Sequence, residues 1–200
     1  MKRVLSIDFD YFINTDLETR NEKFPDGVDA KDNEHMLKDW DSFYKQYPEI
    51  KDIGVIPEFD SVCLALKHME KAKVFIAMSH KDIETIFDFN DDGQSYDVAH
   101  IDFHHDMYLG ANPNTLDCSN WVRFLMDKCP YSEVHWVRRE DSETSSLLGE
   151  YPYDSYTEWI LLPKYDYVFL CFSPEWTPPH LKPFFDKMCR EVQHLEPTYL

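Results

Sequence analysis

Short runs of apolar residues alternate along the chain with stretches in which apolar residues recur every three or four positions. The short runs are rich in β-branched and aromatic side chains and most are too short for helices, so each predicts a buried strand. The predicted strands span residues 3–8, 74–78, 98–102, 134–137 and 168–172. An alternation of buried strands and amphipathic helices is typical of a parallel sheet with helices on its faces. The pattern therefore predicts an α/β fold, a three-layer α/β/α arrangement with a mainly parallel sheet.

Four stretches show helical spacing and predict helices that pack on this sheet. They lie near residues 36–47, 62–69, 121–126 and 181–192. Pro48 is predicted to stop the first helix. The predicted starts are Asp60 for the second helix, Ser119 or Asp117 for the third, and Thr177 followed by Pro178 for the fourth. Residues 14–33 and 139–156 predict irregular loops, which in a small domain tend to be lids or binding loops.

Composition narrows the setting of this fold. The 200 residues, 43% of them hydrophobic and 16% aromatic, suffice for a single domain over residues 1–200. The apolar runs are far too short to cross a membrane, and the five cysteines are odd in number and form no Cys-x-x-Cys pair. We therefore expect a soluble protein with reduced thiols in the cytoplasm.

The chain is strongly acidic, with a formal net charge of −18 at pH 7. Such a surface repels nucleic acids and anionic membranes, so we expect neither as a partner. It favours a cationic partner only weakly, because an acidic surface also serves solubility.

Carboxylates and imidazoles follow the ends of four predicted strands. In chain order they are Asp8 and Asp10, then His80, then Asp102, His104 and Asp106, and finally Glu175. The carboxyl ends of parallel strands meet at one edge of a sheet, where open α/β folds bind their ligands. Side chains two apart in an extended chain point to the same side, so we expect Asp102, His104 and Asp106 to share one direction. The same spacing pairs Asp8 with Asp10.

Four carboxylates in one place are costly unless cations neutralise them. Together with His80 and His104 they exceed the three or four ligands of one zinc site, and their chemistry suits manganese or iron. We therefore expect two metal ions that share a bridging carboxylate and a bridging water, which they convert to hydroxide near neutral pH. Alone, Asp-x-Asp can form a turn and His80 can be a capping or surface histidine. For His100 and His105, ligand orientation, proton transfer and a structural role all stay open.

These segments resemble motifs of the arginase/deacetylase superfamily. Asp102-Phe-His-His-Asp resembles the Asp-x-His-x-Asp metal motif of arginases and agmatinases, and Ser6-Ile-Asp-Phe-Asp resembles their Ser-x-Asp-x-Asp motif. Ser79-His80 resembles the histidine segment Gly-Gly-Asp-His without its glycines. The order is permuted, because Asp-x-Asp opens this chain and lacks the usual following Asp-Pro. With Cys171-Phe-Ser-Pro-Glu-Trp near the end, the arrangement is most similar to peptide arginases, manganese enzymes that convert arginine residues of ribosomal peptides to ornithine and release urea.

The resemblance implies an arginase-like fold, two Mn²⁺ ions and an arginine-containing peptide as substrate. The ligands it implies are His80, Asp102, Asp106 and Asp8 for one ion, and His104, Asp102, Asp8 and Asp10 for the other, with Asp8 and Asp102 bridging. Glu175 resembles the carboxylate that orients the guanidinium, which suits a two-pronged hydrogen bond; alternatively it favours a helix N-terminus. Asn120 would contact the peptide or cap a helix. His105 would protonate the leaving amine.

Three other functions are compatible with parts of the pattern. A haloacid-dehalogenase-like phosphatase also begins with a strand and Asp-x-Asp and could use Asp91-Asp92 with magnesium, but Phe12 stands where those enzymes carry Thr or Val. It also gives Asp-Phe-His-His-Asp no role. A single-zinc deacetylase would use Asp102 and His104 but would not need His80. A metal-stabilised binding protein would hold a peptide without hydrolysing it.

Overall fold

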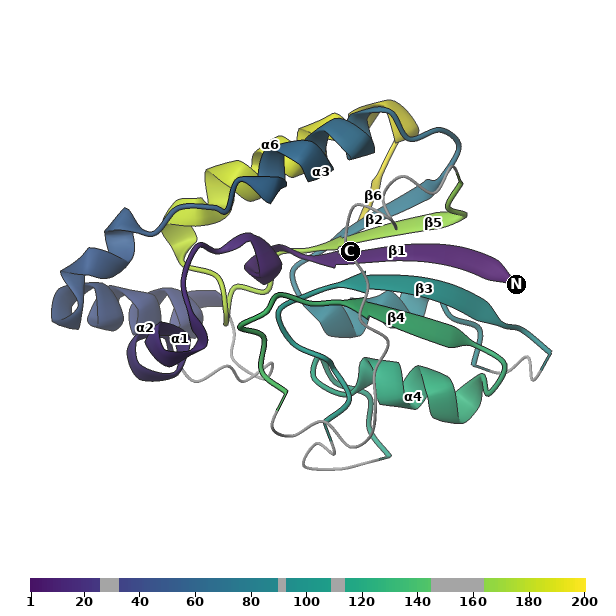
Figure 1. Cartoon of the computed structure of the whole chain (residues 1–200), viewed down its shortest axis with the longest axis horizontal. Helices are drawn as coiled ribbons and strands as arrows, with labels where there is room; N and C mark the ends of the chain where they lie inside the picture. The colour runs from purple at the N-terminus through teal and green to yellow at the C-terminus, as the bar shows by residue number, and fades with distance from the viewer. Residues whose placement is uncertain (26–32, 90–92, 109–113, 145–163) are drawn as a thin grey trace.

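The structure is a computed structural model that describes residues 1–25, 33–89, 93–108, 114–144 and 164–200. The described strands form one six-stranded sheet in the order β4-β3-β1-β5-β2-β6, and neighbouring strands all run parallel (Figure 1). Their bounds are β1 Lys2–Asp8, β2 Lys73–Ala77, β3 Tyr96–Ile101, β4 Glu133–Val137, β5 Tyr167–Cys171 and β6 Thr198–Tyr199. The predicted parallel sheet is confirmed.

Helices cover both faces of this sheet. α3 (Glu58–Lys67) and α6 (Lys182–Glu191) lie side by side over one face, and α4 (Trp121–Lys128) lies over the other (Figure 1). The remaining helices among the described residues are α1 Leu17–Lys23 and α2 Asn33–Gln46, with 3₁₀ helices at Phe9–Phe12, Pro48–Asp52, His80–Thr85, Pro179–Leu181 and Gln193–Leu195. The three-layer arrangement is therefore confirmed. None of the helices within the described ranges combines the length and the apolar character that crossing a lipid bilayer requires.

Burial of both faces explains why the strands are nearly continuous apolar runs. Leu5 of β1 packs into the core beneath α3 and α6, together with Phe185. Val4 packs into the core beneath α4, together with Trp121. Because side chains alternate along a strand, the buried Ser6 shares the α4 face with Val4. A polar side chain is thus placed on this face two residues before the strand ends.

Two short elements, β6 and α1, differ from the sequence prediction. β6 has only two residues, too few to show an alternation. α1 lies in the stretch predicted to be irregular, where Oδ1 of Asp16 accepts a hydrogen bond from N of Thr19 at 2.7 Å and so caps the helix. Of the two predicted loops, residues 26–32 and 145–156 lie outside the described residues.

None of the three predicted helix starts is confirmed, and for α4 it is Asn120, not Ser119 or Asp117, that directly precedes the helix. α3 begins after Pro57, so Asp60 lies inside its first turn and not at its N-cap. Thr177 does not cap a helix either, because its Oγ1 donates to O of Phe172 at 2.7 Å and a 3₁₀ turn separates it from α6. The predicted stop is confirmed, since α2 ends just before Pro48.

Candidate metal centre

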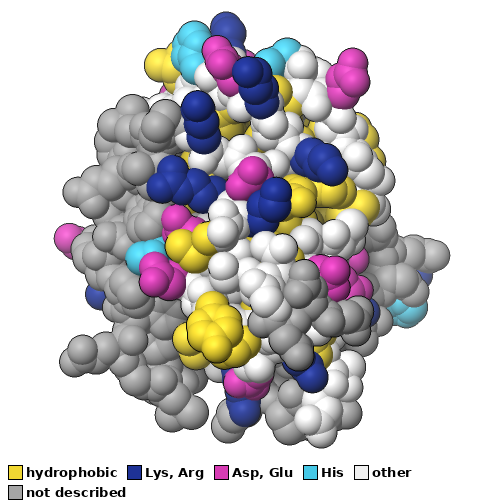
Figure 2. Space-filling model, turned by 90° about the vertical axis from the view of Figure 1, so that its right-hand side faces the viewer, with side chains coloured by type: hydrophobic (Ala, Val, Ile, Leu, Met, Phe, Trp, Pro, Cys, Tyr) yellow, Lys and Arg dark blue, Asp and Glu magenta, His cyan; other side chains and the backbone are white. Residues whose placement is uncertain are grey.

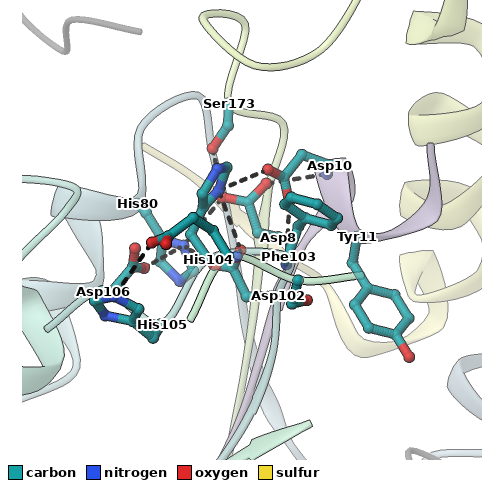
Figure 3. A network of polar contacts seen from close by, with 12 residues as sticks. Asp8, Asp10, Tyr11, His80, Asp102, Phe103, His104, His105, Asp106 and Ser173 are labelled. Atoms are coloured by element: carbon teal, nitrogen blue, oxygen red, sulfur yellow. Dashed lines mark hydrogen bonds and ion pairs between the residues drawn. The ribbon is translucent and has the colours of Figure 1, made fainter. Parts of the chain in front are cut away.

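Four neighbouring strands end at the same edge of the sheet. The order β3-β1-β5-β2 places side by side the four strands after which the sequence predicts functional residues. Figure 3 shows the side chains that follow β1, β2 and β3 converging beyond the strand ends, namely those of Asp8, Asp10, His80, Asp102, His104 and Asp106. Asp8, His80, Asp102 and Asp106 are each at most 5% exposed. The predicted residues therefore form a buried polar cluster.

One group of potential metal ligands consists of His80, His100, Asp102 and Asp106. Nδ1 of His80 lies 3.2 Å from Oδ2 of Asp102 and 3.4 Å from Oδ2 of Asp106. Nε2 of His100 faces the same two oxygens, at 3.5 and 3.6 Å. One donor atom from each of the four residues lies within 4.8 Å of the others. Such a set of nitrogens and carboxylate oxygens is suited to a divalent transition-metal ion.

A second group consists of Asp10, Asp102 and His104. Nδ1 of His104 lies 2.9 Å from Oδ2 of Asp10 and 3.8 Å from Oδ1 of Asp102. Asp102 thus belongs to both groups and turns a different oxygen to each, Oδ2 to the first and Oδ1 to the second. A carboxylate placed in this way is suited to bridge two cations.

Asp8 lies beside the first group but belongs to neither group. Its Oδ2 is 3.1 Å from Nδ1 of His80 and accepts a hydrogen bond from Oγ of Ser173 at 2.5 Å. Its Oδ1 accepts a hydrogen bond from N of Asp10 at 3.2 Å, because the chain turns from β1 into the 3₁₀ helix Phe9–Phe12. The extended spacing predicted for Asp8 and Asp10 is therefore wrong. The bridging role of Asp8 stays a prediction.

The chain after β3 also turns earlier than an extended strand would. N of His104 donates to Oδ1 of Asp102 at 2.8 Å, so the backbone curls around this carboxylate. Asp106 has a left-handed backbone conformation with a φ of 51°. Residues other than glycine rarely adopt this conformation, and backbone strain of this kind is concentrated at functional sites. Asp106 therefore joins His80 and Asp102 through a strained turn and not through strand alternation.

The charges of the cluster are unbalanced. Burial, together with the negative charges of Asp10 and Asp8, raises the pKa of Asp102 well above its ordinary value. Burial and the charge of Asp102 do the same to the pKa of Asp106. Burial opposes protonation of His80, but its contacts with Asp102 and Asp8 outweigh burial and raise the pKa of His80. The metal-free cluster therefore retains protons, which bound cations would displace.

His100 is a ligand candidate whose role the sequence leaves open. Its side chain has no exposed surface, and neither ring nitrogen has a partner at good hydrogen-bond geometry among the described residues, although the nearby backbone of His104 acts to raise its pKa. Burial, reinforced by the charge of His80, lowers the pKa of His100 well below its ordinary value, so the ring is neutral. A buried neutral imidazole that faces two carboxylates fits a metal ligand better than a structural histidine, which would be hydrogen-bonded.

A buried arginine supports the second group. Nη1 of Arg20 lies 3.5 Å from Oδ2 of Asp10, and Nη2 donates to the backbone O of Asp10 at 2.7 Å. Its Cζ lies 3.7 Å from the ring centre of Phe103. Burial opposes ionisation of Asp10, but His104 and Arg20 outweigh it and lower the pKa of Asp10. The sequence pattern does not reveal Arg20, because it predicts no helix in residues 14–33. Asp16, which caps α1, is the signal that could have predicted the helix that carries Arg20.

Hydrogen bonds from neighbouring side chains orient the first group. Oγ of Ser6 and Nε2 of His80 lie 2.7 Å apart, and Nε1 of Trp121 donates to Oδ2 of Asp106 at 2.5 Å. Partners of this kind fix the orientation of metal ligands. Sequence reasoning assigns Trp121 only to a helix, since apolar periodicity does not distinguish an indole that packs from one that also donates.

His105 contacts a carboxylate outside the two groups. Its Nε2 lies 3.9 Å from Oε2 of Glu143, and its ring stacks on Tyr108 with centroids 4.1 Å apart. N of Met107 donates to Nδ1 of His105 at 2.9 Å, so the neutral ring carries its hydrogen on Nε2. Burial lowers the pKa of His105 to about 4, although Glu143 acts in the opposite direction. The ring is neutral at neutral pH, and its role as proton donor stays a prediction.

Glu175 and Asn120 are the predicted substrate contacts. Glu175 is buried in the loop after β5, at the edge where the cluster lies. Asn120 directly precedes α4, where the sequence predicts Ser119 or Asp117 as the cap. Its Oδ1 accepts from N of Asp117 and its Nδ2 donates to O of Thr115, both at 2.9 Å. This pairing favours a structural role for Asn120, and substrate contact by either residue stays a prediction.

No protein-family model, curated protein or solved structure matches this chain. The chemistry of the candidate metal centre is therefore the guide to function. Its two ligand groups offer imidazole nitrogens and carboxylate oxygens but no thiolate, a donor set that fits manganese, iron or zinc. The buried, unbalanced carboxylates and the unpaired nitrogens of His100 fit bound cations as well.

Proposed function

We propose that this chain is a manganese-dependent hydrolase that converts arginine residues of a peptide to ornithine and releases urea. The observation that supports the proposal most is the position of Asp102, whose two oxygens face two separate groups of potential ligands. A shared carboxylate suits a pair of cations, whereas a single ion would leave one of its oxygens without a metal. The resemblance of the Asp-x-His-x-Asp and Asp-x-Asp segments to those of arginases suggests the reaction.

Two sets of side chains would hold the two ions. The first set is His80, His100, Asp102 and Asp106, and the second is Asp10, Asp102 and His104. This assignment differs from the one that the resemblance implies, because His100 joins the first set and Asp8 instead contacts His80. When bound, a pair of divalent cations neutralises the carboxylates and activates water for hydrolysis near neutral pH.

Glu175 and His105 would act on the substrate. Glu175 would accept two hydrogen bonds from the guanidinium and so orient it. His105 is neutral at rest, so to act as the predicted acid it would first take up a proton released by the water consumed in the hydrolysis and then pass a proton to the nitrogen that leaves with the ornithine side chain. The net charge of −18 favours the approach of a cationic side chain.

One observation favours a second candidate, a single-metal hydrolase such as a deacetylase. Oδ2 of Asp10 already faces two cationic partners, Nδ1 of His104 at 2.9 Å and Nη1 of Arg20 at 3.5 Å. These contacts could balance Asp10 without a second ion, and the first group alone offers four ligands. The number of ions bound per chain distinguishes the two candidates.

The proposed function is tested by urea release. The manganese-loaded chain is incubated with a peptide that contains one arginine, and both urea and the mass of the peptide are measured. We expect one urea per ornithine formed, loss of product with a chelator, and recovery when manganese is restored. Free arginine and agmatine are assayed in parallel, because the sequence does not distinguish guanidino substrates. No urea from any of them would contradict the proposal, and peptide binding without product would support the binding-protein alternative.

A further inference from the structure

Solvent reaches the candidate metal centre on the side of His104. The side chain of His104 is 15% exposed, whereas those of the other ligand candidates are at most 7% exposed. The ring of Trp176 lies against His104, with centroids 4.6 Å apart and planes tilted by 46°. Trp176 is itself only partly buried. A molecule that approaches the cluster from this side therefore meets the indole of Trp176.

The loop that carries Trp176 is held in place by several hydrogen bonds. N of Trp176 and N of Thr177 both donate to O of Ser173, at 3.0 and 2.9 Å. Nε1 of Trp40 donates to O of Pro174 at 2.8 Å, which ties the loop to α2. A loop fixed in this way presents the indole in a defined position, so little conformational freedom is lost when a ligand contacts it.

We propose that Trp176 is a specificity-determining residue, whose indole face stacks on the planar guanidinium of the substrate. This inference rests on the proposed function. An aromatic face attracts a cation, most strongly when the ring is tryptophan, and a guanidinium is flat enough to stack on it. Trp176 directly follows Glu175, so one short loop supplies both an aromatic face and a carboxylate.

The same combination already holds a guanidinium inside this protein. Cζ of Arg20 lies 3.7 Å from the ring centre of Phe103, while its Nη1 faces Oδ2 of Asp10 at 3.5 Å. An aromatic ring on the face and a carboxylate at the edge thus accommodate one guanidinium at this end of the sheet. Trp176 and Glu175 would provide the equivalent pair for a guanidinium that arrives from solvent.

The test compares variants at Trp176 in the manganese-loaded protein. Trp176→Leu removes the aromatic face, Trp176→Phe keeps a weaker one, and Tyr131→Leu changes an aromatic side chain that is 73% exposed in the turn between α4 and β4. For Trp176→Leu we expect KM for the arginine peptide to rise about ten-fold with kcat within about two-fold of wild type. Trp176→Phe should fall between, and Tyr131→Leu should match wild type.

Peptides that differ only at the arginine position sharpen the test. Citrulline keeps the planar shape without the charge, and lysine keeps the charge without the plane. By titration calorimetry, wild type should bind both more weakly than the arginine peptide, and Trp176→Leu should change their affinities less than two-fold. Manganese affinity must also stay unchanged in Trp176→Leu. If it falls together with peptide affinity, Trp176 only supports His104 and the inference is overturned.

Failure of this inference can be told apart from failure of the proposed function. If wild type releases urea and Trp176→Leu keeps the wild-type KM, the inference fails and the proposed function stands. If wild type releases no urea but Trp176→Leu loses affinity for the arginine peptide in calorimetry, the proposed function fails and the guanidinium contact stands. If neither urea release nor a difference in affinity is found, both are wrong.

Discussion

Charged side chains lie at both edges of the central sheet, but in opposite surroundings. At the amino edge, where the strands begin, the side chain of Arg3 is 42% exposed and its Nε lies 3.5 Å from Oδ2 of Asp97. Lys73, the first residue of β2, is exposed as well. Figure 2 shows this side of the molecule, with side chains of both charges at its surface among hydrophobic ones. At the carboxyl edge, the acidic members of the two ligand groups are buried.

This difference indicates which charges a bound ion would stabilise. Water solvates charges at the amino edge, and an exposed ion pair there contributes only about 0–1 kcal/mol. At the carboxyl edge, Asp102 and Asp106 are buried beside each other, and neutral donors such as N of His104 and Nε1 of Trp121 do not balance their charges; their pKa values are raised. Their burial is therefore expected to destabilise the protein without metal and to be offset if the proposed cations bind. Substitutions at the carboxyl edge should therefore change metal binding, whereas matched substitutions at the amino edge should not.

The largest effect is expected from Asp102→Asn. Because Asp102 faces both ligand groups, the amide should reduce urea release by more than about a hundred-fold. A loss of about a hundred-fold is the largest that is typical when a residue that only orients metal ligands is mutated. The metal-free variant should be at least as stable as wild type at pH 8, since an uncompensated buried charge is gone. The control is Asp97→Asn at the amino edge, which should change neither quantity. A fully active Asp102→Asn variant would refute the proposed site.

His100→Phe should weaken metal binding next most strongly. Phenylalanine keeps a ring against Trp121, whose centroid lies 4.9 Å away, but removes both nitrogens. We expect manganese affinity to fall about ten- to a hundred-fold, with no loss of stability in the metal-free protein because the nitrogens have no hydrogen bonds there. Equilibrium dialysis measures the affinity. His135→Phe on β4 is the matched control, and equal affinities for the two variants would exclude His100 as a ligand.

The metal-free protein should lose stability as the pH rises above 6.5. Burial opposes the protonation of His104, but the negative charge of Asp10 outweighs burial and raises the pKa of His104. The pKa values of His80, Asp102 and Asp106 are raised as well. Above 6.5, the ordinary histidine pKa, the fold thus holds protons that the unfolded chain has released. Each net proton gives a slope of about 1.4 kcal/mol per pH unit.

This pH profile can be measured by urea denaturation with and without manganese. Bound manganese should flatten or reverse the loss above pH 6.5, because the ion and the protons compete for the same groups. His100 and His105, whose pKa values are lowered, act only below that pH and in the opposite direction. A metal-free protein that becomes more stable from pH 7 to 9 would show that the cluster does not hold protons.

The smallest effect is expected from a pair of glycine substitutions. Ser173 at the carboxyl edge and Lys71 in the turn before β2 both have positive φ, 49° and 62°. Glycine should relieve about 1 kcal/mol of backbone strain at either position. Only Ser173→Gly also removes the hydroxyl that donates to Oδ2 of Asp8, so it alone should lower manganese affinity, by about ten-fold. Melting temperature and dialysis of both variants measure the two quantities; equal manganese affinity would remove Ser173 from the site.

The strands and the edge of the sheet could be predicted because their signals are local. Five apolar runs mark the strands, and Asp102, His104 and Asp106 directly follow one of them. Parallel strands then bring separate strand ends together without further information. The order β3-β1-β5-β2 fulfils this expectation, since the four strands concerned are neighbours.

The rest depends on contacts between distant segments, which no local pattern contains. Arg20 is placed against Asp10 and Phe103 by the docking of α1. His100 lies in an apolar strand pattern, and only the packing around it turns its Nε2 toward Asp102. The turn after Asp8 replaces the extended chain that the spacing predicted, because Asp8 caps a 3₁₀ helix.

The most direct measurement is the number of metal ions bound per chain, determined by elemental analysis after dialysis against manganese. Two equivalents are expected for wild type and for Asp97→Asn, and fewer for Asp102→Asn, because Asp102 turns one oxygen to each ligand group. One equivalent in wild type would favour the single-metal hydrolase. No bound metal, or two equivalents that Asp102→Asn retains, would contradict a site in which Asp102 joins two cations.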